Sequence, residues 1–251
     1  MPTSKQPPPL SGVDRVDQLL GEARYGVMQY RCVATSLAGF LQQLTVSYLS
    51  HGYWFYVTGC VPEGKDPELV DAKLIAKYGI SVSRWARARR KKAGLANLQY
   101  IRYRRFFVLL ATHGKHQFFE EEADRTHDAR KRPITFWGYS VSYRQGHPHV
   151  RIQQTDYSLL KVRMLDAAVR QGAEELWASF RELPYEPYAP ARRQLLNILR
   201  AVNRRRKLAS LPLIEVTCIR MRRHICRPFG STDAEPACQR PGGHTAPAAV
   251  R

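Results

Sequence analysis

The chain has 251 residues, 44% of them apolar and 10% aromatic, which is enough for a hydrophobic core and excludes a wholly disordered protein. Forty Lys and Arg against 21 Asp and Glu give a formal net charge of +19, which excludes the balanced surface of an ordinary enzyme. This charge indicates an acidic partner, with nucleic acid favoured over an anionic lipid surface.

The N-terminal segment "MPTSKQPPPLSG" is rich in Pro and lacks the apolar core of a secretory signal. We therefore expect residues 1–12 to form a disordered arm and the protein to be cytoplasmic. The longest apolar run, residues 106–111, is far shorter than the roughly 20 residues that cross a bilayer, so no membrane association is expected.

Two elements are predicted next along the chain. Apolar residues recur at spacings of three and four between residues 37 and 48, which is typical of an amphipathic helix within residues 33–50. Aromatic and β-branched residues at 53–61 then predict a buried strand.

A helix is predicted with well-defined ends after residue 65. Asp66 can cap it, Pro67 suits the first helical position, and Gly79 can end it. The basic segment that follows is predicted to be helical up to Gly94. Together these segments could form a helix-turn-helix over residues 66–95.

The sequence from residue 98 to residue 207 predicts two hairpins followed by two helices. Residues 98–111 form two strands with a bend at Arg104 and Arg105, and "ITFWGYSVSYRQGHPHVRIQ" forms two more joined at Gln145 and Gly146. The expected helices cover residues 157–180 and 191–207.

The last part of the chain is predicted to hold one strand and a tail. Residues 211–225 alternate as a strand would, and residues 230–251 are expected to form a disordered tail. The predicted fold is one α+β domain, residues 13–229, with a mainly antiparallel sheet and helices packed on its faces.

Five cysteines, at positions 32, 60, 218, 226 and 238, show no CxxC pairing. Neither a disulfide framework nor a structural zinc site of the usual spacing is indicated. Cys32, Cys60 and Cys218 have apolar neighbours in the sequence and are expected in the core.

Positive charge is concentrated in residues 84–105, 192–207 and 220–227, with Arg well in excess of Lys. The planar guanidinium of Arg matches phosphate oxygens, so this composition favours recognition of nucleic acid. The predicted phosphate-binding residues are Arg84, Arg87, Arg89, Arg90, Lys91, Lys92, Arg102, Arg104, Arg204, Arg205 and Arg206. The hypothesis requires these cations to gather on one continuous surface.

Aromatic residues lie within the first basic segment, at Trp85, Tyr100 and Tyr103, and directly after it, at Phe106 and Phe107. Aromatic rings among cations can stack on the bases of single-stranded nucleic acid. The alternative is that these rings belong to the core and the arginines to a solvated face.

A short histidine motif resembles a known family. "HPHVRI", with His147 and His149, is similar to the histidine strand of HUH endonucleases, the rolling-circle plasmid initiators and related transposases. The resemblance implies a metal bound by His147 and His149, Mg or Mn, and Tyr157 on the following helix as the nucleophile that attacks DNA. Arg151 stands where plasmid initiators often have a further histidine, and Arg cannot bind a metal.

A second group of polar residues lies in "ATHGKHQFFEEEADRTHD", residues 111–128. Its histidines and carboxylates could hold a metal ion for phosphodiester cleavage. The alternative is an acidic loop that forms surface ion pairs with neighbouring basic residues.

The sequence therefore predicts a basic protein that binds DNA or RNA, associated with a mobile element. The rival prediction is a metal-dependent enzyme that nicks single-stranded DNA, and without that activity no cofactor is expected. A third is a basic protein that packs on an acidic protein or ribosomal RNA without chemistry; no particular protein partner is indicated.

Overall fold

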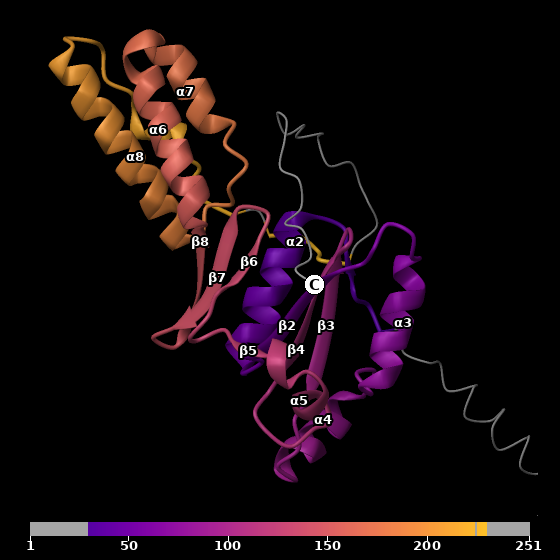
Figure 1. Cartoon of the computed structure of the whole chain (residues 1–251). Coiled ribbons are helices and arrows are strands. Elements are labelled where there is room, and N and C mark those ends of the chain that lie inside the picture. The colour runs from indigo at the N-terminus through magenta and orange to yellow at the C-terminus, as the bar shows by residue number, and fades with distance from the viewer. Residues whose placement is uncertain (1–29, 224, 230–251) are drawn as a thin grey trace, which may run out of the picture. The chain divides into compact units, whose positions relative to one another are not determined.

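The computed structural model describes residues 30–223 and 225–229. The predicted disordered arm and tail, residues 1–12 and 230–251, lie outside the described residues. From Cys32 onward the described chain belongs to one compact unit. It is α+β, as predicted, with a five-stranded sheet in the order β1-β3-β4-β2-β5 and a three-stranded sheet in the order β6-β7-β8 (Figure 1).

The five-stranded sheet is antiparallel except for one pair. Its strands are β1 (Val33–Ala34), β2 (Phe55–Cys60), β3 (Leu98–Tyr103), β4 (Phe106–Ala111) and β5 (His127–Asp128). Only β1 and β3 run parallel. Arg104 takes the left-handed conformation, φ 54°, in the turn between β3 and β4, which confirms the predicted bend.

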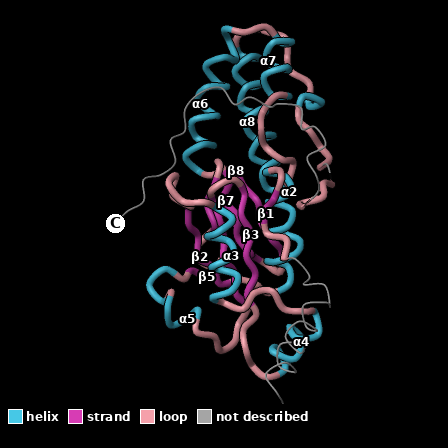
Figure 2. Tube along the Cα trace, turned by 90° about the vertical axis from the view of Figure 1, so that its right-hand side faces the viewer, coloured by secondary structure: helices cyan, strands magenta, loops and turns pink. Residues whose placement is uncertain are grey.

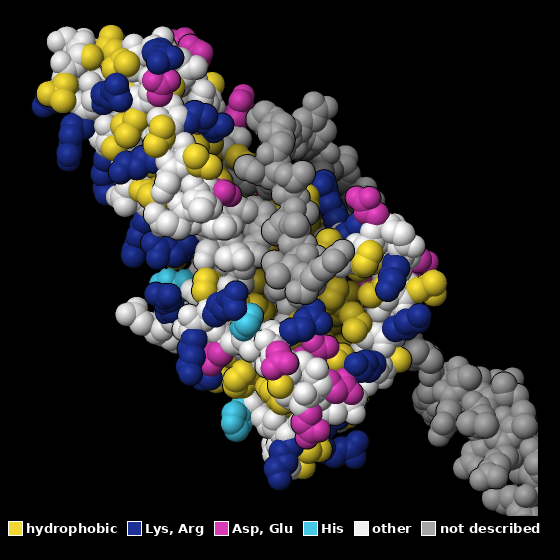
Figure 3. All heavy atoms as spheres, in the orientation of Figure 1, with side chains coloured by type: hydrophobic (Ala, Val, Ile, Leu, Met, Phe, Trp, Pro, Cys, Tyr) yellow, Lys and Arg dark blue, Asp and Glu magenta, His cyan; other side chains and the backbone are white. Residues whose placement is uncertain are grey.

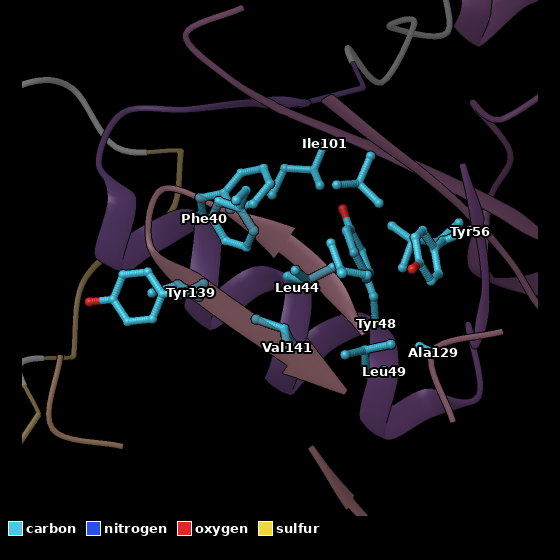
Figure 4. Packing of buried hydrophobic residues seen from close by; sticks show 14 of the residues in the cluster. Phe40, Leu44, Tyr48, Leu49, Tyr56, Ile101, Ala129, Tyr139 and Val141 are labelled. Atoms are coloured by element: carbon cyan, nitrogen blue, oxygen red, sulfur yellow. The ribbon is translucent and has the colours of Figure 1, made fainter. Parts of the chain in front are cut away.

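The predicted helix at 33–50 is helical from residue 37 onward. It consists of α2 (Leu37–Gln42), a π-helical segment (Gln43–Tyr48) and a 3-10 turn (Leu49–His51). Its apolar side chains enter a core shared by both sheets. Figure 4 shows Leu44 between Ile101 of the larger sheet and Val141 of the smaller one.

The smaller sheet consists of β6 (Ile134–Phe136), β7 (Tyr139–Arg144) and β8 (His147–Ile152), all antiparallel. The hairpin predicted at Gln145 and Gly146 is confirmed, with φ of 51° and 78° at its two turn residues. A similar turn at Trp137 and Gly138 adds β6.

Helix α3 (Pro67–Lys77) has the predicted cap: the backbone N–H of Glu68 donates to Asp66 Oδ1 at 2.9 Å. Helix α4 (Arg84–Lys92) begins at Ser83, whose hydroxyl accepts from Ala86 N at 3.1 Å. Asp71 is the only buried residue of α3, and α4 has none. The two helices therefore share no apolar core of the kind that holds a helix-turn-helix together.

Three further helices form a second core with the end of β8: α6 (Gln154–Arg170), α7 (Ala173–Arg181) and α8 (Ala189–Leu208) (Figures 1 and 2). The prediction of one helix at 157–180 is wrong, because the chain is extended at Gln171 and Gly172 and becomes helical again only at Ala173, where α7 begins. Helix α8 confirms the predicted helix at 191–207. Between β4 and β5 lies the short helix α5 (Phe118–Glu121).

The strand predicted at 211–225 is wrong within the described residues. The segment is irregular, with a 3-10 turn at Val216–Cys218. The side chain of Asn203 donates to Ile214 O at 2.8 Å and accepts from Ile214 N at 2.9 Å. An amide side chain thus takes the place of a neighbouring strand.

Cys32 and Cys218 are buried, as predicted, whereas Cys60 is exposed at the end of β2. Burial, together with the carboxylate of Asp71, raises the pKa of Cys32 to about 12. No helix among the described residues is long and apolar enough to span a bilayer.

Candidate nucleic-acid interface

Helix α8 has a buried side and a cationic side. Residues such as Leu195, Ile198 and Val202 face the second core. The exposed residues Arg193, Arg200, Arg204 and Lys207 follow at spacings of seven, four and three, which places them along one stripe of a helix. The whole 20-residue helix contains no Asp or Glu.

The outer face of the β7–β8 hairpin also carries cationic and polar side chains. Along β8, Val150 and Ile152 point into the core, so the alternate residues His147, His149 and Arg151 point outward. The register places three residues of β7 opposite them on the same face: Arg144 pairs with His147, Ser142 with His149 and Ser140 with Arg151.

One side chain of α8 fixes the helix to the hairpin. Gln194 Oε1 accepts from Ile152 N at 2.8 Å, and Gln194 Nε2 donates to Ile152 O at 3.1 Å. The next residue back, Arg193, consequently lies close enough to His149 to act on its pKa. We call the combined region the α8–hairpin surface; it consists of Ser140, Ser142, Arg144, His147, His149, Arg151, Arg193, Arg200, Arg204 and Lys207.

The α8–hairpin surface is electrostatically uncompensated. Burial, followed by the charges of Arg144 and Arg151 and further cationic neighbours, holds the pKa of His149 below its usual value. No ion pair among the described residues includes a cation of this surface. Figure 3 shows Lys and Arg side chains gathered along the edge of the molecule from α8 to the hairpin.

Ser142 faces this cationic surface but is almost wholly buried, 6% exposed, so the more accessible donors are the imidazole and guanidinium groups around it. Its side chain makes no hydrogen bond to the described part of the chain. A hydroxyl can donate to an oxygen acceptor, as can the neighbouring imidazole and guanidinium groups. The chemistry of the surface therefore suits an oxyanion.

A second cationic region, the α4 surface, consists of Arg84, Arg87, Arg89, Arg90, Lys91 and Lys92. None of these forms an ion pair among the described residues. In both views α4 and α8 lie at opposite ends of the compact unit (Figures 1 and 2). The expectation of one continuous basic surface is therefore wrong: the cations form two separate regions. The nucleic-acid hypothesis can hold only in a narrower form, in which each region is a binding surface of its own.

Two predicted phosphate-binding residues are buried, and that prediction is wrong for both. Arg102, 6% exposed, contacts the carboxylate of Asp71 through Nε and Nη2 at 2.8–2.9 Å. Arg206, 1% exposed, donates to the carbonyl oxygens of Pro212, Ala168 and Gln171 at 2.6, 2.8 and 2.9 Å. Both guanidinium groups hold secondary-structure elements together.

Other arginines of the basic segments also have intramolecular partners. Arg104 is exposed but lies over the ring of Trp137, 4.9 Å from its centroid. Arg90 donates to Gly79 O at 3.1 Å. In the third basic segment, Arg220 donates to Leu183 O and Tyr185 O at 3.1 and 2.9 Å. Arg84, Arg89, Lys91, Lys92, Arg204 and Arg205 keep the surface positions that the prediction requires, whereas Arg87 is half-buried.

The HUH-like residues lie near one another in the chain, but the donor set does not fit a divalent metal. His147 and His149 share the outer face, and α6, with Tyr157 in its first turn, begins two residues after β8. No group of three or more His, Cys, Asp or Glu side chains that could hold a metal ion occurs among the described residues. Arginines surround His149 instead, and their charge opposes a metal cation.

The acidic segment after β4 is engaged in surface pairs. Glu121 binds Lys77 at 2.8 Å, Glu122 binds Arg125 at 3.2 Å, and Asp128 binds Arg130 at 2.7 Å. These contacts favour the loop of ion pairs over the metal-site alternative.

Several residues of the α8–hairpin surface were not predicted from the sequence. Arg193 and Arg200 could have been found, because they share the helical spacing of Arg204. Arg144, Arg151 and the two serines required the register of the hairpin.

Comparisons with known proteins do not assign the chain to a family. No family model matches the chain, and no curated protein matches it significantly.

Proposed function

We propose that this protein binds nucleic acid through the α8–hairpin surface. The observation that carries the proposal is the stripe Arg193, Arg200 and Arg204, which is exposed, contains no acid and continues into an outer sheet face of arginines, histidines and serines. Phosphates offer the acceptors and the negative charge that these groups lack.

The composition of the surface favours nucleic acid over lipid. A helix that lies in a membrane interface buries an apolar face in the headgroup region. The apolar face of α8 is already occupied by the second core, and its outward stripe consists of Arg, Asn and Lys except at its C-terminal end, where Leu208 is 84% exposed. The outer face of the hairpin adds only polar side chains.

The proposal is tested by replacing three cations of the stripe. A variant with Arg193→Gln, Arg200→Gln and Arg204→Gln should bind a labelled duplex or single-stranded oligonucleotide at least about tenfold more weakly at moderate salt. Its plot of log affinity against log salt should be shallower by about 2–3, because each neutralised phosphate contributes about 0.9 on duplex DNA. Binding is measured by fluorescence anisotropy across a salt series.

The matched control carries Lys65→Gln, Lys73→Gln and Arg181→Gln, three exposed cations outside both cationic surfaces. It removes the same net charge and should retain nearly the wild-type affinity and salt slope. Equal losses in the two variants would show that only net charge matters, and an affinity of the wild type independent of salt would overturn the proposal.

The rival hypothesis, that the protein is an enzyme that nicks single-stranded DNA, predicts a covalent product. Single-stranded DNA and Mn²⁺ would then give a covalent protein–DNA adduct that is absent in Tyr157→Phe. If the protein only binds nucleic acid, we expect no adduct with wild type or with Tyr157→Phe, and the two should bind the oligonucleotide with the same affinity. An adduct that depends on Tyr157 would replace the binding proposal with an enzymatic one.

A further inference from the structure

The outward face of α4 holds one large, uncovered aromatic residue. Trp85 is 80% exposed. Ala88, Arg89 and Lys92 follow it at spacings of three, four and seven, so the four residues share one face of the helix. The half-buried residues Ala86, Arg87 and Arg90 lie on the opposite face, toward the rest of the protein.

Trp85 differs from the other three tryptophans of the chain. Trp54 lies under Arg130, Trp137 lies under Arg104, and the indole N–H of Trp177 donates to Thr217 Oγ1 at 3.2 Å. The side chain of Trp85 has no ring contact, cation–π contact or hydrogen bond within the described chain. Most of its surface is therefore accessible to a partner.

Polar contacts hold α4 in place without an apolar core. Arg90 Nη1 donates to Gly79 O at 3.1 Å, and Asn97 Nδ2 donates to Arg87 O at 3.0 Å. Lys115 N donates to Gly94 O just after the helix. A nine-residue helix is marginal in isolation, so these contacts keep the exposed indole on an ordered platform.

The surroundings of Trp85 favour an anion. The sequence contains no Asp or Glu between Tyr78 and Glu120. Arg89 and Lys92 lie about 6 Å and about 10 Å from Trp85 along the helix axis. A partner with a flat aromatic group for Trp85, and with negative charges at these separations for Arg89 and Lys92, would match both the aromatic and the cationic part of this face.

We infer that α4 binds single-stranded nucleic acid, with one base stacked on Trp85 and neighbouring phosphates on Arg89 and Lys92. The inference rests on the proposed function and adds a preference for unpaired strands. Base faces are covered by their neighbours inside a duplex, so an indole can stack only on an unpaired base. A lipid surface is disfavoured because Trp85 is the only large apolar residue of the nine in α4.

The test compares Trp85→Ala with wild type on a labelled oligo(dT) strand and on a duplex of equal length. We expect about tenfold weaker binding of the single strand, an unchanged salt slope and unchanged duplex binding. Trp85→Phe should recover much of the loss, because phenylalanine also stacks. Leu159→Ala, which trims another exposed apolar side chain on a helix, is the matched control and should bind as wild type does.

The outcomes separate this inference from the proposed function. If wild type binds neither oligonucleotide, the proposed function fails. If it binds both and Trp85→Ala changes neither, or weakens both equally, only the role of α4 is overturned. Vesicles rich in phosphatidylserine form a further arm: binding that depends on Trp85 there, with unchanged oligonucleotide affinity, would assign α4 to a lipid surface. Melting curves of each variant verify folding.

Discussion

Arginine has three roles in this chain. Arg102 completes a buried ion pair with Asp71, which also accepts from the hydroxyl of Tyr100 at 2.6 Å. Arg206 binds three carbonyl oxygens at the junction of α6, α8 and the segment after α8. Arg200 points outward and forms no ion pair among the described residues. Total positive charge therefore overstates the charge available to a partner.

The buried role of Arg206 is tested by Arg206→Met. Methionine can fill part of the space but leaves the carbonyl oxygens of Ala168, Gln171 and Pro212 without this donor, so we expect a loss of about 3 kcal/mol in the free energy of unfolding. Arg205→Met, one residue earlier and exposed, should change it by less than about 0.5 kcal/mol. Urea titration measures both, and equal effects would contradict the structural role.

The sequence could not separate these roles. Arg204, Arg205 and Arg206 form one uninterrupted basic run, yet successive helical residues point about 100° apart, so one of the three enters the core. The pattern of α8 identifies its buried stripe. It does not reveal that an Arg can lie there, because that depends on carbonyl groups contributed by the end of α6 and by Pro212.

At the scale of elements, α4 depends on a close approach of two backbone segments. Gly114, at φ 141°, lies so near residues 94–96 that an added Cβ would be 2.5 Å from Ala96 N. Its neighbour Lys115 pairs with Gly94 and Ala96 there, at 3.0 and 3.1 Å. The position of α4 therefore requires glycine at residue 114.

Gly114→Ala should lower the free energy of unfolding by about 3 kcal/mol, because backbone atoms must move to admit the methyl group. Gly52→Ala is the control: its φ of 91° is also unfavourable for alanine, but an added Cβ would meet nothing within 4 Å, so a loss of about 1 kcal/mol is expected. Similar losses in thermal or urea unfolding would show that the contact at Gly114 is unimportant.

Elements with local signals were predicted well from the sequence, and those decided by distant contacts were not. Asp66, Pro67 and Gly79 fix the ends of α3 by local chemistry. Residues 211–225 alternate as a strand does, but their partner is the side chain of Asn203 rather than another strand. The candidate interface follows the same rule. The cationic stripe of α8 can be recognised from residue spacing within one helix, whereas the junction of α8 with the hairpin depends on the distant contact between Gln194 and Ile152.

At the scale of the molecule, each of the two cationic surfaces holds Lys and Arg side chains without an acidic partner. The positive charges within one surface therefore repel one another. Added salt screens this repulsion, so without ligand the melting temperature should rise by about 2–5 °C between low and moderate NaCl. The Arg193, Arg200 and Arg204 triple Gln variant should show a smaller rise, because part of the repulsion is gone. A melting temperature that falls with salt in differential scanning fluorimetry would mean that attractive ion pairs dominate.

Strand β8 forms one margin of the smaller sheet, where a strand from another molecule could in principle attach. The amide of Gln194 occupies both backbone hydrogen-bonding groups of Ile152 at that margin. If the chain binds nucleic acid as proposed, copies bound side by side on one strand would be hindered from pairing their sheets at this end. The residue that joins α8 to the hairpin would thus also oppose strand-to-strand association between copies.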